Sequence, residues 1–401
     1  MDLTISPAPL CGSIQSIPSK SAAHRLLICA AFADRETEIC CPVLSKDICA
    51  TAGCLQAMGA LIRYEKGSFF VKPIENYVEK PLLDCGESGS TLRFLLPIVC
   101  ALGKGGCIKM SGRLPERPLS PLWEELEKHG VRLSRPEKDT ILLEGKLQAG
   151  DYKIRADISS QFISGLLFAL PLLEGESRII MDGELQSAGY VRMTQQAQSE
   201  FSLTCPLENN VFNIAAGAQY VSPAKLTVEG DWSNAAFWLV ADALSEGRIE
   251  VNGLSENSLQ GDKAVLDSIE RIKKGNAVID VKDIPDLLPV LSVLAAVSAG
   301  ETKFINAGRL RLKESDRLKA VEDMLLALGG NCEVIEDSLV IKGGSLRGGI
   351  VNSLNDHRIA MSAAVAAIAC SESVTVIGAE SVEKSYPKFF EDYKKLGGKV
   401  L

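Results

Sequence analysis

The sequence predicts a mixed α/β protein built from two similar domains, and three observations lead to this fold class. The chain has 401 residues, which is too long for one ordinary hydrophobic core and suits two. Apolar residues make up 46% of the chain and charged residues 23%, as in typical globular proteins. A strand followed by a turn recurs along the chain, with amphipathic helices between several copies. A repeated unit therefore explains the pattern better than the alternative, one long alternation of helices and strands in a single sheet.

The recurring strand has six copies, which begin at Ile39, Ile108, Ile179, Ile249, Phe304 and Val374. Successive starting points are 69, 71, 70, 55 and 70 residues apart, so only the step after the fourth copy is short. Near-constant spacing is typical of a duplicated structural unit. We therefore expect six units, taken three at a time to form two domains.

Helices are expected after several of these strands, each leading into two short strands. The helical segments open the ranges 46–72, 118–145, 314–343 and 386–401. In the third, Leu318, Val321 and Leu325 recur at the spacing of one helix face. Glycine stands where each helix should end, at Gly59, Gly130, Gly329 and Gly397. The expected unit is thus strand, turn, helix, strand and strand.

Composition argues against several classes of protein. The net charge of −8 does not suit a general binder of nucleic acids or membrane surfaces, so any anion must be held by local clusters. The N-terminus does not resemble a signal peptide, and the longest apolar stretch, 287–299, is interrupted by Pro289 and too short to cross a bilayer. We expect a cytoplasmic protein, monomeric by default. The twelve cysteines and three histidines show no metal-ligand spacing, so we expect reduced thiols and no metal.

Polar groups gather in the turns after the strands. The glycine-rich loop 84–93, "DCGESGSTLR", offers backbone N–H groups to an anion at a helix N-terminus, although an ordinary helix cap is an equal alternative. The same two alternatives hold for a set of hydroxyl and amide groups before two other helices: Ser159, Ser160, Gln161, Ser187 and Tyr190. Arg117 in "LPERP" stands between prolines that can aim it at a carboxylate or phosphate, or it is a plain surface arginine.

Six cations lie in matching turns of the repeat: Lys20, Arg25, Arg117, Arg317, Arg358 and Lys384. Matching turns tend to share one face, so these cations predict a substrate with more than one anionic group. Asp286 precedes an almost wholly apolar helix, either as its cap or as a general base. Glu314 stands three residues before Arg317, a spacing usual for solvated surface ion pairs. Two acids among these cations would suit acid–base chemistry and would serve no purpose in a simple anion carrier.

At this point the chain resembles a known family. The motifs "SKSAAHR", "GESGSTLR", "LPERP", "SSQF", "IPD", "LKESDRL", "NDHR" and "EKSYP" follow the order found in 5-enolpyruvylshikimate-3-phosphate synthases, over nearly the whole chain. The resemblance implies a two-domain inside-out α/β barrel with three βαβαββ repeats in each domain. It also implies that one domain spans 18–226, that the other combines 1–17 with 227–401, and that the active site lies in the cleft between them.

The implied reaction transfers the enolpyruvyl group of phosphoenolpyruvate to the 5-hydroxyl of shikimate 3-phosphate and releases phosphate. It needs no metal or organic cofactor, and the only partners are these two small molecules, with no nucleic acid and no membrane. By matched motif, Asp286 resembles the family's catalytic base and Glu314 its catalytic acid. The resemblance also implies catalytic roles for Lys20 and Lys384. The resemblance assigns shikimate 3-phosphate to Lys20, Ser21, Arg25, Ser159, Ser160, Gln161, Ser187, Asp286 and Lys313. It assigns phosphoenolpyruvate to Lys20, Gly89, Arg117, Gln161, Arg317, Arg358 and Lys384.

The chain departs from the family pattern in three places and leaves two alternatives open. The segment "PSKS" at residues 18–21, which contains Lys20, lacks the usual glycine and is one residue shorter, Glu87 replaces a common Asn, and Arg309 replaces an Asn of some members. One alternative is the enolpyruvyl transferase that acts on UDP-N-acetylglucosamine, although Cys107 lies ten residues before Arg117, further than that enzyme's cysteine. The other is a non-catalytic anion-binding protein. His24 is expected to have a packing or supporting role.

Overall fold

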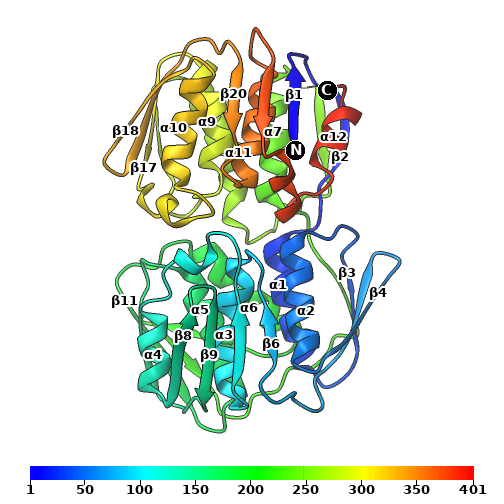
Figure 1. Cartoon of the computed structure of the whole chain (residues 1–401), viewed down its shortest axis with the longest axis vertical. Helices are drawn as coiled ribbons and strands as arrows, with labels where there is room; N and C mark the ends of the chain where they lie inside the picture. Colours follow the sequence, from blue (N-terminus) through cyan, green and yellow to red (C-terminus); the bar gives the residue numbers. More distant parts are fainter. Residues whose placement is uncertain (247) are drawn as a thin grey trace. The chain divides into compact units, whose positions relative to one another are not determined.

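The computed structural model describes residues 1–246 and 248–401, which form two compact units (Figure 1). The continuous unit is Lys20–Val228. The discontinuous unit combines Met1–Ser19 with Glu229–Leu401. None of the described helices combines the length and the hydrophobicity that spanning a bilayer requires.

Three four-stranded sheets form the continuous unit, and each belongs to one βαβαββ repeat. One repeat comprises β6 (Leu82–Asp84), α3 (Gly89–Leu102), β7 (Gly106–Lys109), η1 (Leu114–Glu116), α4 (Leu122–Lys128), β8 (Val131–Glu137) and β9 (Thr140–Gly145). The next comprises β10 (Asp151–Arg155), α5 (Ser160–Ala169), η2 (Leu170–Leu172), β11 (Ser177–Asp182), α6 (Ala188–Glu200), β12 (Leu207–Glu208) and β13 (Val211–Ile214). The third comprises α1 (Lys20–Ala31), β3 (Thr37–Cys40), α2 (Lys46–Ala57), β4 (Leu61–Glu65) and β5 (Ser68–Lys72), and the late strand β14 (Lys225–Thr227) completes it.

All three sheets share one topology. The strand orders are β6-β7-β9-β8, β10-β11-β13-β12 and β14-β3-β5-β4. In each sheet the first two strands are parallel, and the other neighbouring strands are antiparallel. For example, Leu83 of β6 pairs with Ile108 of β7 in parallel, and Ile108 pairs with Ile141 of β9 in antiparallel orientation. A parallel pair needs a crossover connection, which a helix supplies. Two of the sheets are therefore closed locally by their own repeats, whereas β14 closes the third from a distant part of the chain.

Two complete repeats and one short repeat form the discontinuous unit. The complete ones are β16 (Ala277–Asp280), α9 (Leu288–Val297), β17 (Glu301–Ile305), η4 (Gly308–Leu312), α10 (Arg317–Ala327), β18 (Asn331–Ile335) and β19 (Ser338–Lys342), and β20 (Gly349–Asn352), α11 (His357–Ala366), β21 (Val374–Ile377), η5 (Ala379–Lys384), α12 (Phe389–Lys395), β22 (Lys399–Val400) and β1 (Asp2–Ser6). Their strand orders, β16-β17-β19-β18 and β20-β21-β1-β22, repeat the pattern of the continuous unit.

The short repeat explains the irregular spacing in the sequence. It comprises β2 (Gly12–Gln15), α7 (Trp232–Leu244), β15 (Ile249–Asn252), η3 (Gly261–Ala264) and α8 (Val265–Lys273). Its sheet has only β15 and β2, and after α8 the described chain enters β16 without a closing strand pair. The 55-residue step after Ile249 is the length of a repeat that lacks these two strands.

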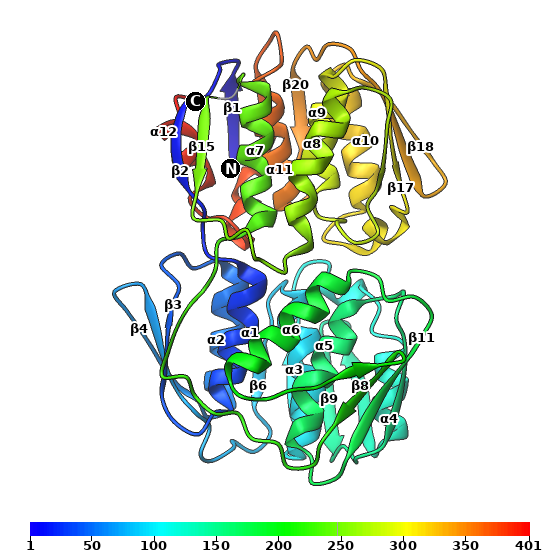
Figure 2. The ribbon, with the colours of Figure 1, turned by 180° about the vertical axis from the view of Figure 1, so that it is seen from behind.

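The core of each unit is made of helices. In the continuous unit α1, α3 and α5 lie among the sheets, and in the discontinuous unit α7, α9 and α11 do so (Figures 1 and 2). These helices are apolar on nearly every side, and every residue of α9 from Leu288 to Ala296 is buried. A helix that is apolar all round must be covered on all sides. By contrast, β4 exposes most of its residues, since the sheets form the outer layer.

The predicted helix ends are confirmed. Gly59, Gly130, Gly329 and Gly397 follow α2, α4, α10 and α12, and each has a positive φ between 83° and 116°. Glycine adopts this left-handed conformation without the steric cost that a Cβ would bring.

Candidate active site

The residues that the sequence singled out fall into two groups, one in each unit. The first group is Lys20, Ser21, Arg25, Gly89, Arg117, Ser159, Ser160, Gln161 and Ser187, all in the continuous unit. The second is Asp286, Lys313, Glu314, Arg317, Arg358 and Lys384, all in the discontinuous unit. Most of them lie at the N-terminal ends of the buried helices: α1 begins at Lys20, α3 at Gly89, α5 at Ser160 and α11 at His357. These helix ends carry partial positive charge and favour anions.

Lys20 at the start of α1 forms an ion pair that the sequence analysis missed. Its Nζ lies 2.8 Å from Oδ2 of Asp47 at the start of α2, and the two side chains are 17% and 14% exposed. No acid lies near Lys20 in the sequence, so its local surroundings suggested an unbalanced charge. The only available signal was an Asp in the first turn of another predicted helix.

Arg25 is buried and held by three hydrogen bonds. Its Nε donates to Thr194 Oγ1 at 2.9 Å, and its two terminal nitrogens donate to the carbonyl oxygens of Ser21 and Tyr190 at 2.7 and 2.8 Å. The guanidinium carbon lies 5.0 Å from the centre of the Phe94 ring. Burial lowers the pKa of Arg25 to about 10, so the side chain stays charged at neutral pH. Arg25 therefore joins α1 to α6 whatever else it binds.

Gly89 lies between two arginines. A Cβ at this position would be 2.7 Å from Nη1 of Arg117 and 2.7 Å from Nη1 of Arg93, too close for either nitrogen to stay in place. Arg93 is 3% exposed, and one of its terminal nitrogens donates to the Pro118 carbonyl at 3.1 Å. The absence of a side chain at 89 lets both guanidinium groups approach the start of α3.

Gln161 connects the starts of α5 and α3. Its Oε1 accepts from Arg93 at 3.3 Å, and its Nε2 donates to Ser90 Oγ at 3.0 Å. Ser159 caps α5 by accepting the Gln161 N–H at 3.3 Å, as the cap alternative predicted. Ser160 is 4% exposed. Sequence reasoning did not single out Arg93, because a single arginine in the second turn of an apolar helix gives only a weak signal.

Ser187 adopts an uncommon backbone conformation. It precedes α6 with φ of 56°, and its side chain makes no cap hydrogen bond. A non-glycine residue in the left-handed region costs about 1–2 kcal/mol. Such strain is typical of positions whose surroundings fix them, and Ser187 is buried.

Asp286 lies among three cations of the discontinuous unit. Its Oδ1 accepts from Arg317 Nη1 at 2.7 Å and lies 3.5 Å from Lys313 Nζ, and its Oδ2 lies 3.2 Å from Arg358 Nη2. Burial raises the pKa of Asp286, but Arg358, Lys313 and Arg317 outweigh burial and hold the pKa well below its usual range. The helix-cap alternative for Asp286 is wrong, because Leu287 occupies the N-cap of α9 and no side chain caps it.

Arg317 holds three carboxylates at once. It is 1% exposed, binds Asp286 through Nη1 and Glu314 through Nη2, and donates from Nε to Asp356 Oδ2 at 2.9 Å. Burial works against the charge on Arg317, but the carboxylates prevail and raise its pKa. The expectation of a solvated Glu314–Arg317 pair is wrong, since Arg317 is fully buried. Asp356, completely buried in the "NDHR" motif, was not singled out, although an Asp before an apolar helix is a recognisable cap.

Lys313, Arg358 and Lys384 complete this group. Burial lowers the pKa of Lys313 to about 8, although Asp286 partly offsets the effect. Arg358 donates to Ser233 Oγ at 2.7 Å and to the Asp286 carbonyl at 3.1 Å. Lys384, at the end of η5 and 7% exposed, donates to the Asn355 carbonyl at 2.6 Å.

A further carboxyl group near Asp286 escaped the sequence analysis. Asp262 in η3 is 3% exposed. Burial first, and then the charge of Asp286, raise its pKa to about 6, against the opposing effects of Arg358 and Ser233. Asp262 is therefore one of two neighbouring acids whose pKa values are moved in opposite directions.

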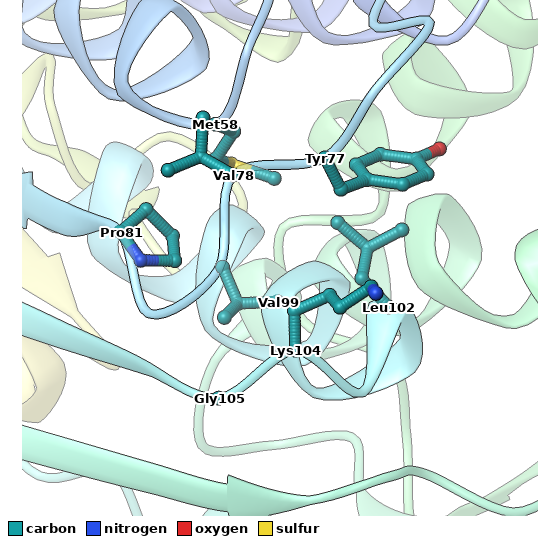
Figure 3. Close-up of a pocket in the computed structure, with 8 residues that line it drawn as sticks. All are labelled: Met58, Tyr77, Val78, Pro81, Val99, Leu102, Lys104 and Gly105. Carbon is teal, nitrogen blue, oxygen red and sulfur yellow. The ribbon is translucent and has the colours of Figure 1, made fainter.

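A small apolar pocket lies elsewhere in the continuous unit. Its lining includes Met58 after α2, Leu102 at the end of α3, Tyr77 and Val99 (Figure 3). Met58, Val99 and Leu102 are at or near the C-terminal ends of α2 and α3, whereas most of the candidate site residues lie at the N-terminal ends of helices. The pocket is therefore separate from the candidate site. All twelve cysteines are free, and the described residues include no group of three or more His, Cys, Asp or Glu side chains arranged to hold a metal.

Solved structures of other proteins share this fold. The structure of EPSP synthase from Acinetobacter baumannii matches with a TM-score of 0.80 and 25% identity, over 100% of this chain and 99% of that one. The enolpyruvyl transferase NikO from Streptomyces tendae matches with a TM-score of 0.79 over 100% and 98% of the chains, and at 16% identity it supports the fold alone. The predicted two-domain α/β fold is thereby confirmed.

Sequence comparison adds the family. The 3-phosphoshikimate 1-carboxyvinyltransferase of Clostridium kluyveri is 41% identical, over 99% of this chain and 98% of its own length. The enzyme of the same name from Clostridium acetobutylicum is 43% identical, over 99% and 97%. The profile of the family described as EPSP synthase (3-phosphoshikimate 1-carboxyvinyltransferase) matches residues 5–393. The chain therefore belongs to the EPSP synthase family.

Proposed function

We propose that this protein transfers the enolpyruvyl group of phosphoenolpyruvate to the 5-hydroxyl of shikimate 3-phosphate and releases phosphate. Membership of the family supports the reaction. The main support for the proposed roles of the residues comes from Asp286. Its carboxylate is ionised and lies within 3.5 Å of cationic nitrogens from three side chains. A carrier of anions would lose affinity by placing this carboxylate among its cations, whereas an enzyme that moves protons needs it.

The first half of the proposed reaction forms a tetrahedral intermediate. Glu314 gives a proton to the methylene carbon of phosphoenolpyruvate, and the 5-hydroxyl oxygen bonds to the central carbon while its proton passes to Asp286. In the second half, the new methyl group returns a proton to Glu314 as the bond to phosphate breaks. The proton on Asp286 leaves with the phosphate, so the atoms balance without an external oxidant, reductant or cofactor.

The cations explain how these acids could be tuned. Without substrate, Arg317 forms ion pairs with both Asp286 and Glu314, and it favours the ionised form of Asp286. When the carboxylate and phosphate of the substrates bind Arg317, Arg358 and Lys384, they offset this positive charge. Both carboxyl groups then hold protons more readily, which a base needs to accept one and an acid needs to deliver one.

The remaining residues would bind and orient the substrates. Shikimate 3-phosphate would contact Lys20, Ser21, Arg25, Ser159, Ser160, Gln161, Ser187, Asp286 and Lys313. Phosphoenolpyruvate would contact Lys20, Gly89, Arg117, Gln161, Arg317, Arg358 and Lys384. We further propose that the protein acts in the cytoplasm as a monomer, which cell fractionation and light scattering would test.

A coupled phosphate-release assay tests the proposed reaction. We expect phosphate only when shikimate 3-phosphate and phosphoenolpyruvate are both present, and an enolpyruvyl product equal in amount to the phosphate. Release that depends on UDP-N-acetylglucosamine instead would identify the related transferase. Binding of both substrates without release would identify a non-catalytic protein. Either result would refute the proposal.

A further inference from the structure

A chain of buried hydrogen bonds joins three helices of the continuous unit. His24 Nδ1 in α1 lies 2.7 Å from Thr51 Oγ1 in α2, and Thr51 Oγ1 lies 2.7 Å from Thr91 Oγ1 in α3. Thr91 Oγ1 in turn donates to Ser88 Oγ at 2.7 Å. None of these four residues is more than 1% exposed. The chain therefore runs entirely through the interior and ends at the N-cap of α3.

The hydroxyl groups fix the direction of this chain. A hydroxyl has one hydrogen to donate, and Thr91 gives its hydrogen to Ser88. Thr51 must then donate to Thr91, which leaves His24 to donate to Thr51. The hydrogen of the neutral ring accordingly sits on Nδ1, and Nε2 carries a lone pair.

The surroundings of the ring agree with this assignment. Nε2 of His24 is buried and has no hydrogen-bond partner among the described residues. A second N–H there would bury both an unpaired donor and a charge. Burial, followed by the charges of Lys20 and Arg25, lowers the pKa of His24 well below its usual range. The ring is therefore neutral at physiological pH.

The hydrogen bond between His24 and Thr51 joins the same two helices as the ion pair of Lys20 and Asp47. His24 is four residues after Lys20 in α1, and Thr51 is four residues after Asp47 in α2, so each pair lies one helical turn from the other on the same helix faces. Two polar links thus connect α1 and α2. The link through His24 and Thr51 continues to α3, where Ser88 also accepts the N–H of Thr91 at 3.3 Å and so caps the first turn, which contains Gly89.

We infer that His24 is a positioning residue: through Thr51 and Thr91 it sets the start of α1, which carries Lys20, against the start of α3, which carries Gly89. This inference rests on the proposed function, which gives both of those residues to phosphoenolpyruvate. Breaking the chain should then weaken phosphoenolpyruvate binding more than it slows the chemical step, because the acid and the base belong to the other unit.

Substitution of Thr51 tests the inference by a comparison of KM and kcat. Thr51→Val keeps the shape of the side chain and removes the hydroxyl, and we expect KM for phosphoenolpyruvate to rise about 10-fold while kcat changes less than about threefold. Thr51→Ser restores a hydroxyl and should restore most of the affinity. Thr37→Val is the matched control, since Thr37 is also 0% exposed and shares a 2.7 Å hydroxyl contact, with Ser222, away from the helix N-termini.

The inference fails if Thr51→Val changes KM no more than Thr37→Val does, or if Thr51→Ser is as defective as Thr51→Val. Nitrogen NMR of the ¹⁵N-histidine-labelled wild-type protein gives a second test that leaves the hydrogen bonds of His24, Thr51 and Thr91 intact. The signals of the other two histidines are assigned by comparison with His129→Gln and His357→Asn. We expect His24 to show a protonated Nδ1 and an unprotonated Nε2 at neutral pH. The opposite tautomer, or a protonated ring, would overturn the direction of the chain.

These outcomes are separable from failure of the proposed function. If the wild-type protein releases no phosphate from the two substrates, the proposed function fails, and the NMR result still decides the direction of the chain. If the wild-type protein is active and the Thr51 variants behave like the control, the function stands and the positioning role is refuted.

Discussion

Replacement of Gly89 by alanine should raise KM for phosphoenolpyruvate much more than KM for shikimate 3-phosphate. The new Cβ would lie 2.7 Å from the terminal nitrogens of both Arg117 and Arg93. Ordinary van der Waals contact begins near 3.4 Å, so one or both guanidinium groups must withdraw by several tenths of an ångström. Arg93 is 3% exposed and is hydrogen-bonded to Gln161 and Pro118, whereas Arg117 is only half-buried. Most of the displacement should therefore fall on Arg117.

The size of the effect follows from this displacement. Misplacing a binding group by about 1 Å can cost roughly 100-fold in rate, so a shift of about 0.7 Å should raise KM for phosphoenolpyruvate by roughly 10- to 100-fold. We expect KM for shikimate 3-phosphate to change less than about threefold, because Arg117 is not proposed to bind that substrate. Steady-state phosphate release with each substrate varied in turn measures both values.

A second glycine in the same unit provides the control. Gly53 is exposed in the middle of α2, and a Cβ there would meet nothing within 4 Å. Gly53→Ala should leave both KM values unchanged and stabilise the protein by about 1 kcal/mol, since alanine is the better helix former. The steric reasoning would be refuted if Gly89→Ala kept KM for phosphoenolpyruvate within twofold of the wild-type value.

Three further predictions concern the discontinuous unit. Arg317→Met should lower the free energy of unfolding by about 3–5 kcal/mol, because it removes the cation that pairs with the fully buried carboxylate of Asp356, whereas Arg311→Met at a 38%-exposed side chain should cost less than about 1 kcal/mol in the same urea titration; equal losses would contradict this. Asp286→Asn should reduce kcat by roughly 100- to 10,000-fold and leave calorimetric binding of shikimate 3-phosphate intact or tighter, and near-normal turnover would rule out Asp286 as the base. Lys313 loses its proton as pH rises through its pKa of about 8, so the affinity for shikimate 3-phosphate should fall above that pH and Lys313→Arg should abolish the fall; an unchanged profile in that variant would show that another group is responsible.

The fold was largely predictable because its rules are local. Apolar helices, terminal glycines and the constant step between strands each depend on neighbouring residues, and they indicated the repeat without further information. The short fourth step was visible too, but its cause was not, because a missing strand pair leaves no residues to interpret. The completion of one repeat by β14, which pairs Leu226 with Ile39, depends on pairing between distant parts of the chain and had no local pattern.

The site was predictable for residues that recur in turns and unpredictable for their buried partners. Lys20 and Arg317 stand in motifs, whereas Asp47 and Asp356 act through contacts 27 and 39 residues away in the sequence. The cap alternative for Asp286 was reasonable from position alone and failed because three cations attract its carboxylate more strongly than the helix terminus does. The sequence also could not show that the Glu314–Arg317 ion pair is buried at Arg317. The spacing of two residues indicates that they meet, but it does not indicate whether water reaches them.

The sheet order β20-β21-β1-β22 has a consequence for biosynthesis. β1 leaves the ribosome long before its neighbours β21 and β22, which begin at Val374 and Lys399. At roughly 5–20 residues per second, β1 waits on the order of 20 to 70 s for its partners. The continuous unit contains every strand of its own sheets by Thr227 and can close during that interval. β1 must meanwhile remain an unpaired strand, so it is the segment for which chaperone binding during translation would matter most.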